Sequence, residues 1–204
     1  MRNEGLLIVI SGPSGAGKGT VYNEVISRRP EIRKSISVTT RAPRPNEVDG
    51  VHYYFKTLEQ YQEMIAHGEF LETANVYCNY YGTPKAPVLK MLDEGADVMF
   101  EIDTLGAAQI KHKYPKSISI FVMPPDFEIL EQRLRGRGTE SEEVMKRRLG
   151  FAKKELAKYK QFDYIVFNDK LEDAVNNVLA IIDAEKSKIK RNEVRIKQLL
   201  NEEN

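Results

Sequence analysis

The segment SGPSGAGKGT, residues 11–20, combines four glycines with one lysine directly after a run of apolar residues. Its GxxxxGK pattern, from Gly12 to Lys18, lies between an expected buried strand and an expected helix. The backbone N–H groups of such a loop converge on an anion, the helix dipole reinforces them, and the lysine adds its charge. The pattern therefore predicts a site for the phosphates of ATP or GTP, formed by Gly12, Pro13, Ser14, Gly15, Ala16, Gly17, Lys18, Gly19 and Thr20.

The glycine loop does not by itself identify a reaction. A tight strand-to-helix turn that needs glycine only for its geometry is the alternative interpretation. GTPases, motor proteins and small kinases share such loops, so the acceptor must be identified from other residues. The loop also departs from the usual pattern, because Gly19 takes the position of the Ser or Thr whose hydroxyl binds Mg²⁺ and Thr20 follows it.

A second group of candidate anion ligands occurs in the segment SVTTRAPRPNEVDGVHYYF, residues 37–55. Arg41 and Arg44 are three residues apart beside prolines that stiffen the backbone, and planar guanidinium groups suit bidentate phosphate binding. The hydroxyl groups of Tyr53 and Tyr81 can donate to the same anion. Taken alone, the segment is equally compatible with a solvated surface loop.

Short apolar runs rich in branched residues recur along the chain. They have the length and near-continuous apolarity of strands covered on both faces, and they occupy residues 6–11, 36–39, 97–102, 117–123 and 163–168. Because helical periodicity separates several of these runs, we expect an α/β fold with a P-loop NTPase-type parallel five-stranded sheet wrapped by helices. After Lys170 the pattern predicts one long helix with a charged end, which is either solvated or partner-binding.

Two regions interrupt this alternation. One is rich in Tyr, Pro, Gly, Arg and Glu and predicts an inserted α+β subdomain, and the other is an Arg-rich helical pair that we expect to act as a lid. The predicted divisions are a core of residues 1–36, 88–126 and 159–204, an inserted subdomain of residues 37–87 and a lid of residues 127–158.

Composition limits the classes of function. The chain has 204 residues, a formal net charge of +1 and interleaved charges, so we expect no nucleic-acid or membrane partner. The single Cys78 fits a reducing compartment, and one cysteine with three scattered histidines does not form a zinc cluster. We find no signal-peptide pattern and no apolar stretch of membrane-spanning length, which predicts a cytoplasmic protein. The sequence leaves homo-oligomer formation open.

Two further motifs follow in order, GEFLETANVYCNYYGTP at residues 68–84 and FEIDTLGA at residues 100–107. With the glycine loop and the arginine segment, they resemble guanylate kinases over nearly the whole chain. The resemblance implies transfer of the γ-phosphoryl group of ATP to GMP or dGMP in purine nucleotide metabolism. It also implies that the phosphate of GMP is held by Arg41, Arg44, Tyr53 and Tyr81, and its guanine by Ser37, Glu72, Thr83 and Asp103.

The same resemblance gives roles to the remaining groups. The catalytic residues it implies are Lys18, Arg41, Arg133, Arg137 and Arg148, the last three being lid arginines that close over the transferring phosphoryl group. Asn168 corresponds to a position beside the adenine of ATP, although an Asn that ends a strand is usually a turn residue. Mg²⁺ accompanies ATP, with Thr20 and Glu101 contacting the ion mostly through water.

The chemistry of guanine agrees with the implied role of Glu72. Guanine presents N1–H and the N2 amino group side by side, and one carboxylate can accept both hydrogen bonds. Adenine has a lone pair at N1, so it would leave a buried carboxylate facing an acceptor, which costs about 1 to 3 kcal/mol or more. The acceptor oxygen of GMP is already ionised, so the reaction needs no general base.

Two competing functions differ from this interpretation. A related kinase could act on AMP or on a phosphorylated ribose, and only the combination of Ser37, Glu72, Thr83 and Asp103 favours GMP. Guanylate-kinase-like domains of scaffolding proteins bind phosphorylated peptides without catalysis. Those domains lack a working nucleotide loop, whereas the pattern from Gly12 to Lys18 is complete in this sequence.

Overall fold

The computed structural model of the chain describes residues 4–76, 79–136 and 141–200. A parallel sheet with the strand order β2-β7-β1-β8-β9 forms its centre. The strands of this sheet are β1 (Leu7–Ser11), β2 (Arg33–Lys34), β7 (Val98–Glu101), β8 (Ile118–Met123) and β9 (Tyr164–Phe167). The predicted five-stranded parallel sheet is therefore confirmed.

One predicted strand was wrong. Residues 36–39 were expected in the central sheet, but β3 (Val38–Thr39) belongs to a second sheet and the edge of the central sheet is β2. Arg33 and Lys34 are both exposed, since an edge strand can carry charged side chains that a central strand would have to bury. No apolar pattern therefore marks β2 in the sequence.

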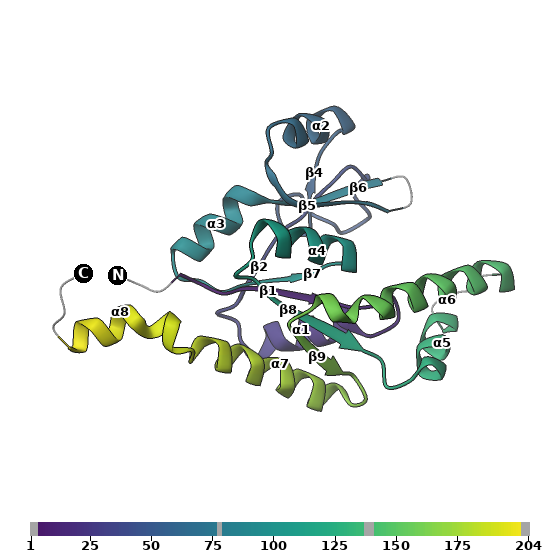
Figure 1. Cartoon of the computed structure of the whole chain (residues 1–204). Coiled ribbons are helices and arrows are strands. Elements are labelled where there is room, and N and C mark those ends of the chain that lie inside the picture. The colour runs from purple at the N-terminus through teal and green to yellow at the C-terminus, as the bar shows by residue number, and fades with distance from the viewer. Residues whose placement is uncertain (1–3, 77–78, 137–140, 201–204) are drawn as a thin grey trace.

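Helices cover both faces of the central sheet (Figure 1). On one face, Ile8 and Ile10 pack with residues of α1 (Lys18–Arg28) and α7 (Leu171–Lys186). On the other face, Leu7 and Val9 pack with residues of α3 (Lys85–Asp93) and α4 (Thr104–Lys113). Each fully buried aliphatic side chain contributes about 1.5 to 3 kcal/mol, so this double packing explains why β1 is apolar at nearly every position.

The second sheet lies between β2 and α3 in the chain and has the order β4-β3-β6-β5. Its other strands are β4 (Tyr54–Phe55), β5 (Phe70–Val76) and β6 (Asn79–Pro84). The helix α2 (Leu58–Ala66) begins at a capping box in which the side chains of Thr57 and Gln60 each accept from the other residue's backbone N–H. A small apolar cluster that includes Val38, Tyr61 and Phe70 holds α2 to this sheet.

The helical pair expected after residue 126 is present as α5 (Phe127–Arg135) and α6 (Glu142–Leu156), followed by the 3₁₀ helix η1 (Ala157–Gln161). The side chains of Asp126 and Ser141 cap the two helices by accepting backbone N–H groups. Buried Leu130, Leu134 and Met145 form a separate apolar cluster between α5 and α6. The pair therefore has a small apolar core of its own, separate from the cores of the two sheets.

The single C-terminal helix predicted after Lys170 was wrong, because α7 ends at Lys186 and α8 (Ile189–Leu199) follows. At the break, the Ser187 hydroxyl donates to the backbone oxygen of Asp183 at 2.8 Å. The side-chain amide of Asn192 donates to the backbone oxygens of Lys186 and Lys188, both at 2.9 Å. These polar side chains satisfy backbone groups at the helix end and replace the missing helical bonds. Within the part of the chain that the structure describes, no helix has the length and apolarity of a membrane span.

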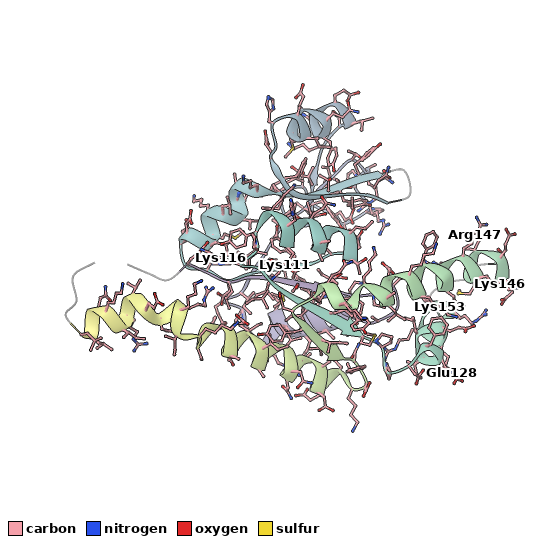
Figure 2. All side chains as sticks on the ribbon, in the orientation of Figure 1. Lys111, Lys116, Glu128, Lys146, Arg147 and Lys153 are labelled. Atoms are coloured by element: carbon pink, nitrogen blue, oxygen red, sulfur yellow. The ribbon has the colours of Figure 1, made fainter. Side chains whose placement is uncertain are left out.

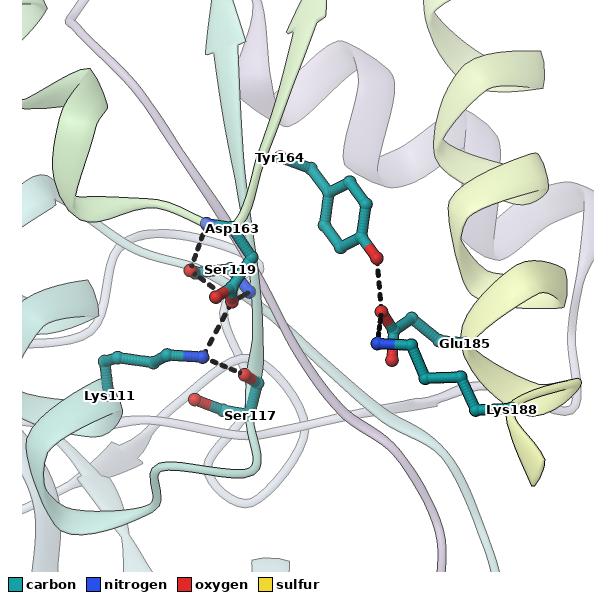
Figure 3. Close-up of polar contacts among 7 residues, drawn as sticks. All are labelled: Lys111, Ser117, Ser119, Asp163, Tyr164, Glu185 and Lys188. Atoms are coloured by element: carbon teal, nitrogen blue, oxygen red, sulfur yellow. Dashed lines mark hydrogen bonds and ion pairs between the residues drawn. The ribbon is translucent and has the colours of Figure 1, made fainter. Parts of the chain in front are cut away.

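A polar network joins the amino ends of β8 and β9 to α4 (Figure 3). One oxygen of Asp163 accepts from the Lys111 ammonium at 2.7 Å and from the Ser119 backbone N–H and hydroxyl at 2.9 and 2.8 Å. Lys111 also donates to the backbone oxygen of Ser117 at 2.7 Å. Burial opposes ionisation of Asp163, but the hydrogen bonds from Lys111 and Ser119 outweigh it and lower the pKa of the carboxyl group.

We expect Asp163→Asn to lower the free energy of unfolding by about 1 to 2 kcal/mol at pH 7, since the half-exposed ion pair is partly screened. The folded-state pKa of Asp163 is below its unfolded value, so its stabilisation is complete above the unfolded pKa of about 4 and is lost as the pH falls through the lower folded value. Urea unfolding of both proteins at pH 7 and pH 3 measures this. A difference between the two proteins that does not shrink at pH 3 would contradict the assignment.

A second contact group ties β9 to the helices beyond the sheet (Figure 3). The hydroxyl of Tyr164 donates to the Glu185 carboxylate, which also pairs with Lys188 at 2.6 Å. Glu185 lies in the last turn of α7 and Lys188 immediately precedes α8. The amino edge of the sheet is therefore cross-linked to both flanking helical layers, while its carboxyl edge carries the candidate site.

Candidate active site

The glycine loop connects the carboxyl end of β1 to the first turn of α1. Gly17 has φ 87, and a Cβ at this position would lie 2.3 Å from the side-chain nitrogen of Asn168. Gly12 has φ 144, and its Cβ would lie 2.3 Å from the backbone oxygen of Val122. Only glycine fits both positions, so the loop packs against the neighbouring ends of β8 and β9.

Lys18 is the first residue of α1, and its ammonium reaches back across the loop. It donates to the backbone oxygens of Gly12 at 2.9 Å and Pro13 at 3.1 Å. The loop thus holds the lysine over its own residues, where an incoming phosphate would meet the charge.

Asn168 is buried and supports the loop through its side chain. Its amide nitrogen donates to the backbone oxygen of Ala16 at 2.8 Å. The guanidinium of Arg133, on α5, donates to the same oxygen at 3.4 Å and to the backbone oxygen of Asn168 at 3.2 Å. A cavity of about 420 Å³ lies beside these contacts and is lined by Gly15, Gly17, Thr20, Arg133 and Asn168 among others.

Glu155, near the end of α6, was not among the residues predicted from the sequence. Its carboxylate accepts the backbone N–H of Ser14 at 3.1 Å, so a residue of the helical pair occupies an amide of the glycine loop. The two residues are 141 positions apart, and no local pattern predicts such a contact.

The predicted lid arginines occupy three different situations. Arg133 contacts the loop, Arg148 is half-buried on α6, and Arg137 lies outside the described residues.

In Figure 2, Lys146 and Arg147 extend from the outer part of α6, and Lys153 lies closer to α5. The Lys153 ammonium lies 4.7 Å from the centre of the Phe127 ring, a cation–π contact that helps hold α6 on α5.

The groups predicted to contact a metal lie together beside the loop. Thr20 and Glu101 line a cavity of about 580 Å³ with Gly19, Asn23 and Glu24. A Cβ at Gly19 would lie 3.4 Å from a carboxylate oxygen of Glu101, so the start of α1 lies directly beside this acidic group. Among the described residues no group of three or more His, Cys, Asp or Glu could hold a metal alone. Oxygen donors with room for water fit Mg²⁺ when phosphates complete the coordination.

The predicted acceptor residues share one face of the second sheet. Glu72 and Thr83 are directly opposite each other on β5 and β6, and the Thr83 hydroxyl donates to the Glu72 carboxylate at 2.6 Å. The rings of Tyr53 and Tyr81 are 6.0 Å apart, and the Arg41 guanidinium lies 5.5 Å from the Tyr53 ring centre. Directly paired residues point to the same side of a sheet, which explains how distant positions in the sequence meet.

The remaining acceptor candidates lie at the borders of this face. Ser37 is half-buried next to β3, and its backbone oxygen accepts the Tyr54 N–H at 2.9 Å. Arg44 has an exposed side chain, and its backbone N–H donates to the Glu47 carboxylate at 2.8 Å. The structure therefore brings Arg41, Tyr53, Tyr81, Thr83 and Glu72 together and leaves the Arg44 side chain in solvent.

Glu47 is a second site residue that was not predicted from the sequence. Its two carboxylate oxygens accept from the two terminal nitrogens of Arg41 at 2.9 and 3.0 Å. The hydrogen bond from Arg41 and the Arg44 backbone N–H lower the pKa of Glu47 to about 2. Asn46 makes this return of the chain possible by adopting φ 71, a left-handed conformation that Asn tolerates better than most residues. The sequence contains one signal that could have predicted this pair, namely a glutamate six positions after Arg41 in a turn rich in Pro and Asn.

Burial gives Glu72 unusual electrostatics. Its side chain is 4% exposed, and desolvation raises its pKa, with Asp103 adding a repulsive charge and Thr83 opposing the shift. Asp103 itself caps α4 by accepting the N–H groups of Leu105 and Gly106, both at 2.8 Å. The two carboxyl groups come from different sheets and approach the same space.

Gln109 on α4 fixes the position of β5. Its side chain accepts the backbone N–H of Thr73 at 3.1 Å and donates to the backbone oxygen of Thr73 at 2.8 Å. Thr73 directly follows Glu72, so this pair of hydrogen bonds positions the buried carboxylate relative to the core. Gln109 was also absent from the sequence-based candidates.

The two groups of residues meet at one edge of the central sheet. Ile10, which precedes the glycine loop, is the register partner of Glu101 in the neighbouring parallel strand. Asp103 follows two residues later and begins α4. Because both strands end at the same edge, the loop and the acceptor face border one site, as is usual in open α/β sheets.

Comparisons with known proteins agree on one family. The family model described as guanylate kinase matches residues 4–185. A guanylate kinase from Carboxydothermus hydrogenoformans is 51% identical over 95% of this chain and 95% of its own. One from Caldanaerobacter subterraneus subsp. tengcongensis is 50% identical over 94% and 93%. The crystal structure of guanylate kinase from Anaplasma phagocytophilum matches with a TM-score of 0.78 and 29% identity, covering 100% of this chain and 99% of that one.

Proposed function

The chain belongs to the guanylate kinase family, and from this premise we propose that it transfers the γ-phosphoryl group of ATP to GMP or dGMP within the site described above. The glycine loop holds the phosphates of ATP, and the face of the second sheet holds GMP. We choose GMP as the acceptor because of the buried Glu72 carboxylate. It accepts a hydrogen bond from the Thr83 hydroxyl and lies on the same face of the sheet as Arg41.

Each part of GMP finds groups of suitable chemistry. Arg41, Tyr53 and Tyr81 supply cationic and hydroxyl donors for the phosphate, and Arg44 reaches it from the border of the face. Glu72 accepts from guanine N1–H and N2, while Ser37, Thr83 and Asp103 provide further polar contacts. Adenine would leave the buried carboxylate without a donor, which disfavours AMP.

Transfer requires positioning and charge neutralisation more than covalent chemistry, because the attacking phosphate oxygen is already ionised. Lys18 and the loop N–H groups stabilise negative charge on the ATP phosphates. Arg133 lies beside the loop, and Arg137 and Arg148 act with it when the lid closes and excludes water. Thr20 and Glu101 would hold Mg²⁺, mostly through water, and the ion would supply electrostatic stabilisation of the phosphates.

The test is formation of ADP from ATP with a panel of acceptors, namely GMP, dGMP, AMP and a ribose phosphate. We expect activity with GMP and dGMP and very little with the others. Lys18→Ala is the control, since it removes the loop's side-chain charge and should abolish most of the activity. Equal activity with AMP, or an unaffected Lys18→Ala variant, would contradict the proposal.

We expect Glu47→Gln to raise the KM for GMP by about tenfold while the KM for ATP stays unchanged. The carboxylate fixes two of the Arg41 nitrogens, so its loss frees the guanidinium to adopt orientations that do not bind phosphate. Steady-state kinetics with each substrate varied in turn measures this. Glu47→Asp should restore part of the loss, and Glu63→Gln, an exposed change on α2, is the matched control.

A further inference from the structure

A cavity of about 500 Å³ lies behind the acceptor face, and we name it the junction cavity. Val38, Tyr54 and Pro84 line it, and each is adjacent in the sequence to a predicted acceptor residue: Ser37, Tyr53 or Thr83. Successive residues of a strand point to opposite faces. The junction cavity and the acceptor face are therefore the two sides of the same sheet.

The junction cavity also lies between two hydrophobic clusters. Val38, Tyr54 and Met64 belong to the cluster that holds α2 on the second sheet. Leu89 packs with the cluster that holds α3 and α4 on the central sheet. The lining also includes the first residues of α3, which connect the second sheet to the core. Side chains do not fill this joint, so its shape depends on the angle between the two parts.

The lining of the junction cavity defines the chemistry of a ligand. Its walls are mainly apolar, and its exposed rim carries Lys56, Lys85 and His67 beside the single carboxylate of Glu69. The charges of Lys56 and Lys85 exceed that of the single Glu69 carboxylate, so the rim carries a net positive charge. A volume of this size falls within the range of small-molecule pockets. An aromatic or aliphatic body with one acidic group matches both the walls and the rim.

We propose that the junction cavity is a binding site for a small amphipathic anion, an aromatic or aliphatic carboxylate or sulfonate, and that its occupancy weakens GMP binding. This coupling rests on the proposed function. A ligand there contacts the back of the second sheet and the start of α3 together, which holds them at the angle seen in Figure 1. Under the proposed function, GMP on the front of the sheet has to approach the ATP phosphates at the glycine loop, which requires the second sheet to move toward the core. The two ligands therefore oppose each other reciprocally.

The probe is 1-anilinonaphthalene-8-sulfonate, whose aromatic body and sulfonate match the junction cavity and whose fluorescence reports burial. We expect one saturable site on the full chain that ATP does not displace. Ala86 lines the cavity, so Ala86→Trp places a large side chain in it and should lower the affinity for the probe by about tenfold or more. Ala108→Trp, the same change at an exposed position of α4, is the matched control and should leave binding unchanged.

Lys85→Glu is a second variant. It alters only the exposed rim and should also lower the affinity for the probe. Saturating GMP should weaken binding of the probe by about fivefold or more, and the probe should raise the Kd for GMP by the same factor. If ATP displaces the probe, or if Ala86→Trp and Lys85→Glu both bind the probe as tightly as the wild-type chain, the proposed site is wrong. Probe binding that GMP does not change overturns the coupling.

Failure of the proposed function would look different. Without the probe, the wild-type chain would then form no ADP from ATP and GMP. Probe binding would still respond to Ala86→Trp and not to Ala108→Trp, since these readouts do not depend on catalysis. The two proposals therefore fail in separate measurements.

Discussion

Arg133→Met lowers kcat by about 10³-fold or more, by analogy with the arginines that stabilise phosphoryl transfer in related enzymes. The guanidinium lies between the glycine loop and Asn168, with hydrogen bonds only to backbone oxygens in the described contacts. It therefore lies beside the loop that we propose to hold the ATP phosphates, and a small movement would bring it to the transferring group. Initial rates at saturating ATP and GMP measure the loss.

Arg135→Met is the matched control for this experiment. Arg135 lies on the same helix, but its guanidinium pairs with Glu131 and Glu142 at 2.8 and 2.6 Å on the surface. Exposed pairs of this kind contribute about 0 to 1 kcal/mol, so the variant should keep nearly full activity. Similar losses in both variants would show that Arg133 acts only by maintaining α5.

Glu72→Gln raises the KM for GMP by about 10- to 100-fold, with little effect on the KM for ATP. The amide keeps the size of the side chain, but its nitrogen is a donor. Only its oxygen can therefore accept a hydrogen bond from guanine, whereas both carboxylate oxygens can accept. Because the group is buried, solvent does not compensate for the lost acceptor. A parallel loss of affinity for both nucleotides would contradict the role in guanine recognition.

The pH dependence provides an independent check on Glu72. Burial raises the pKa of this carboxyl group, and only its ionised form accepts both guanine donors. The KM for GMP in the wild-type protein should therefore rise as the pH falls through the raised pKa. In Glu72→Gln this inflection should be absent, whereas Glu63→Gln should retain it because Glu63 is exposed on α2.

The fold was predictable where burial is symmetrical. The strands β1, β7 and β8 are buried at nearly every position, and their apolar runs were identified. The run of β9 was identified too, but the expected cover on both faces was wrong there, because Ile165 and Phe167 are exposed on this edge strand. The edge strand β2 carries only charged side chains, while Val38 in β3 is apolar because of the small second core. Sequence patterns record burial but not which core buries a residue, which explains the exchange of β2 and β3.

The site was predictable where chemistry is local. The glycine loop is a continuous segment, and its geometry follows from the positions of its glycines. Glu155 and Gln109 contact Ser14 and Thr73 across 141 and 36 residues, and such contacts exist only after folding. The role of Glu47 depends on one left-handed residue, Asn46, which no periodicity reveals.

The polar network around Asp163 has a consequence for how the protein can change. It strengthens the amino edge of the central sheet, whereas the contacts proposed for ATP and GMP lie at the carboxyl edge or on the second sheet. Substitutions at positions this far apart, with no shared partner, have nearly additive effects. Sequence drift or engineering can therefore adjust heat tolerance at one end of the strands without disturbing substrate choice at the other.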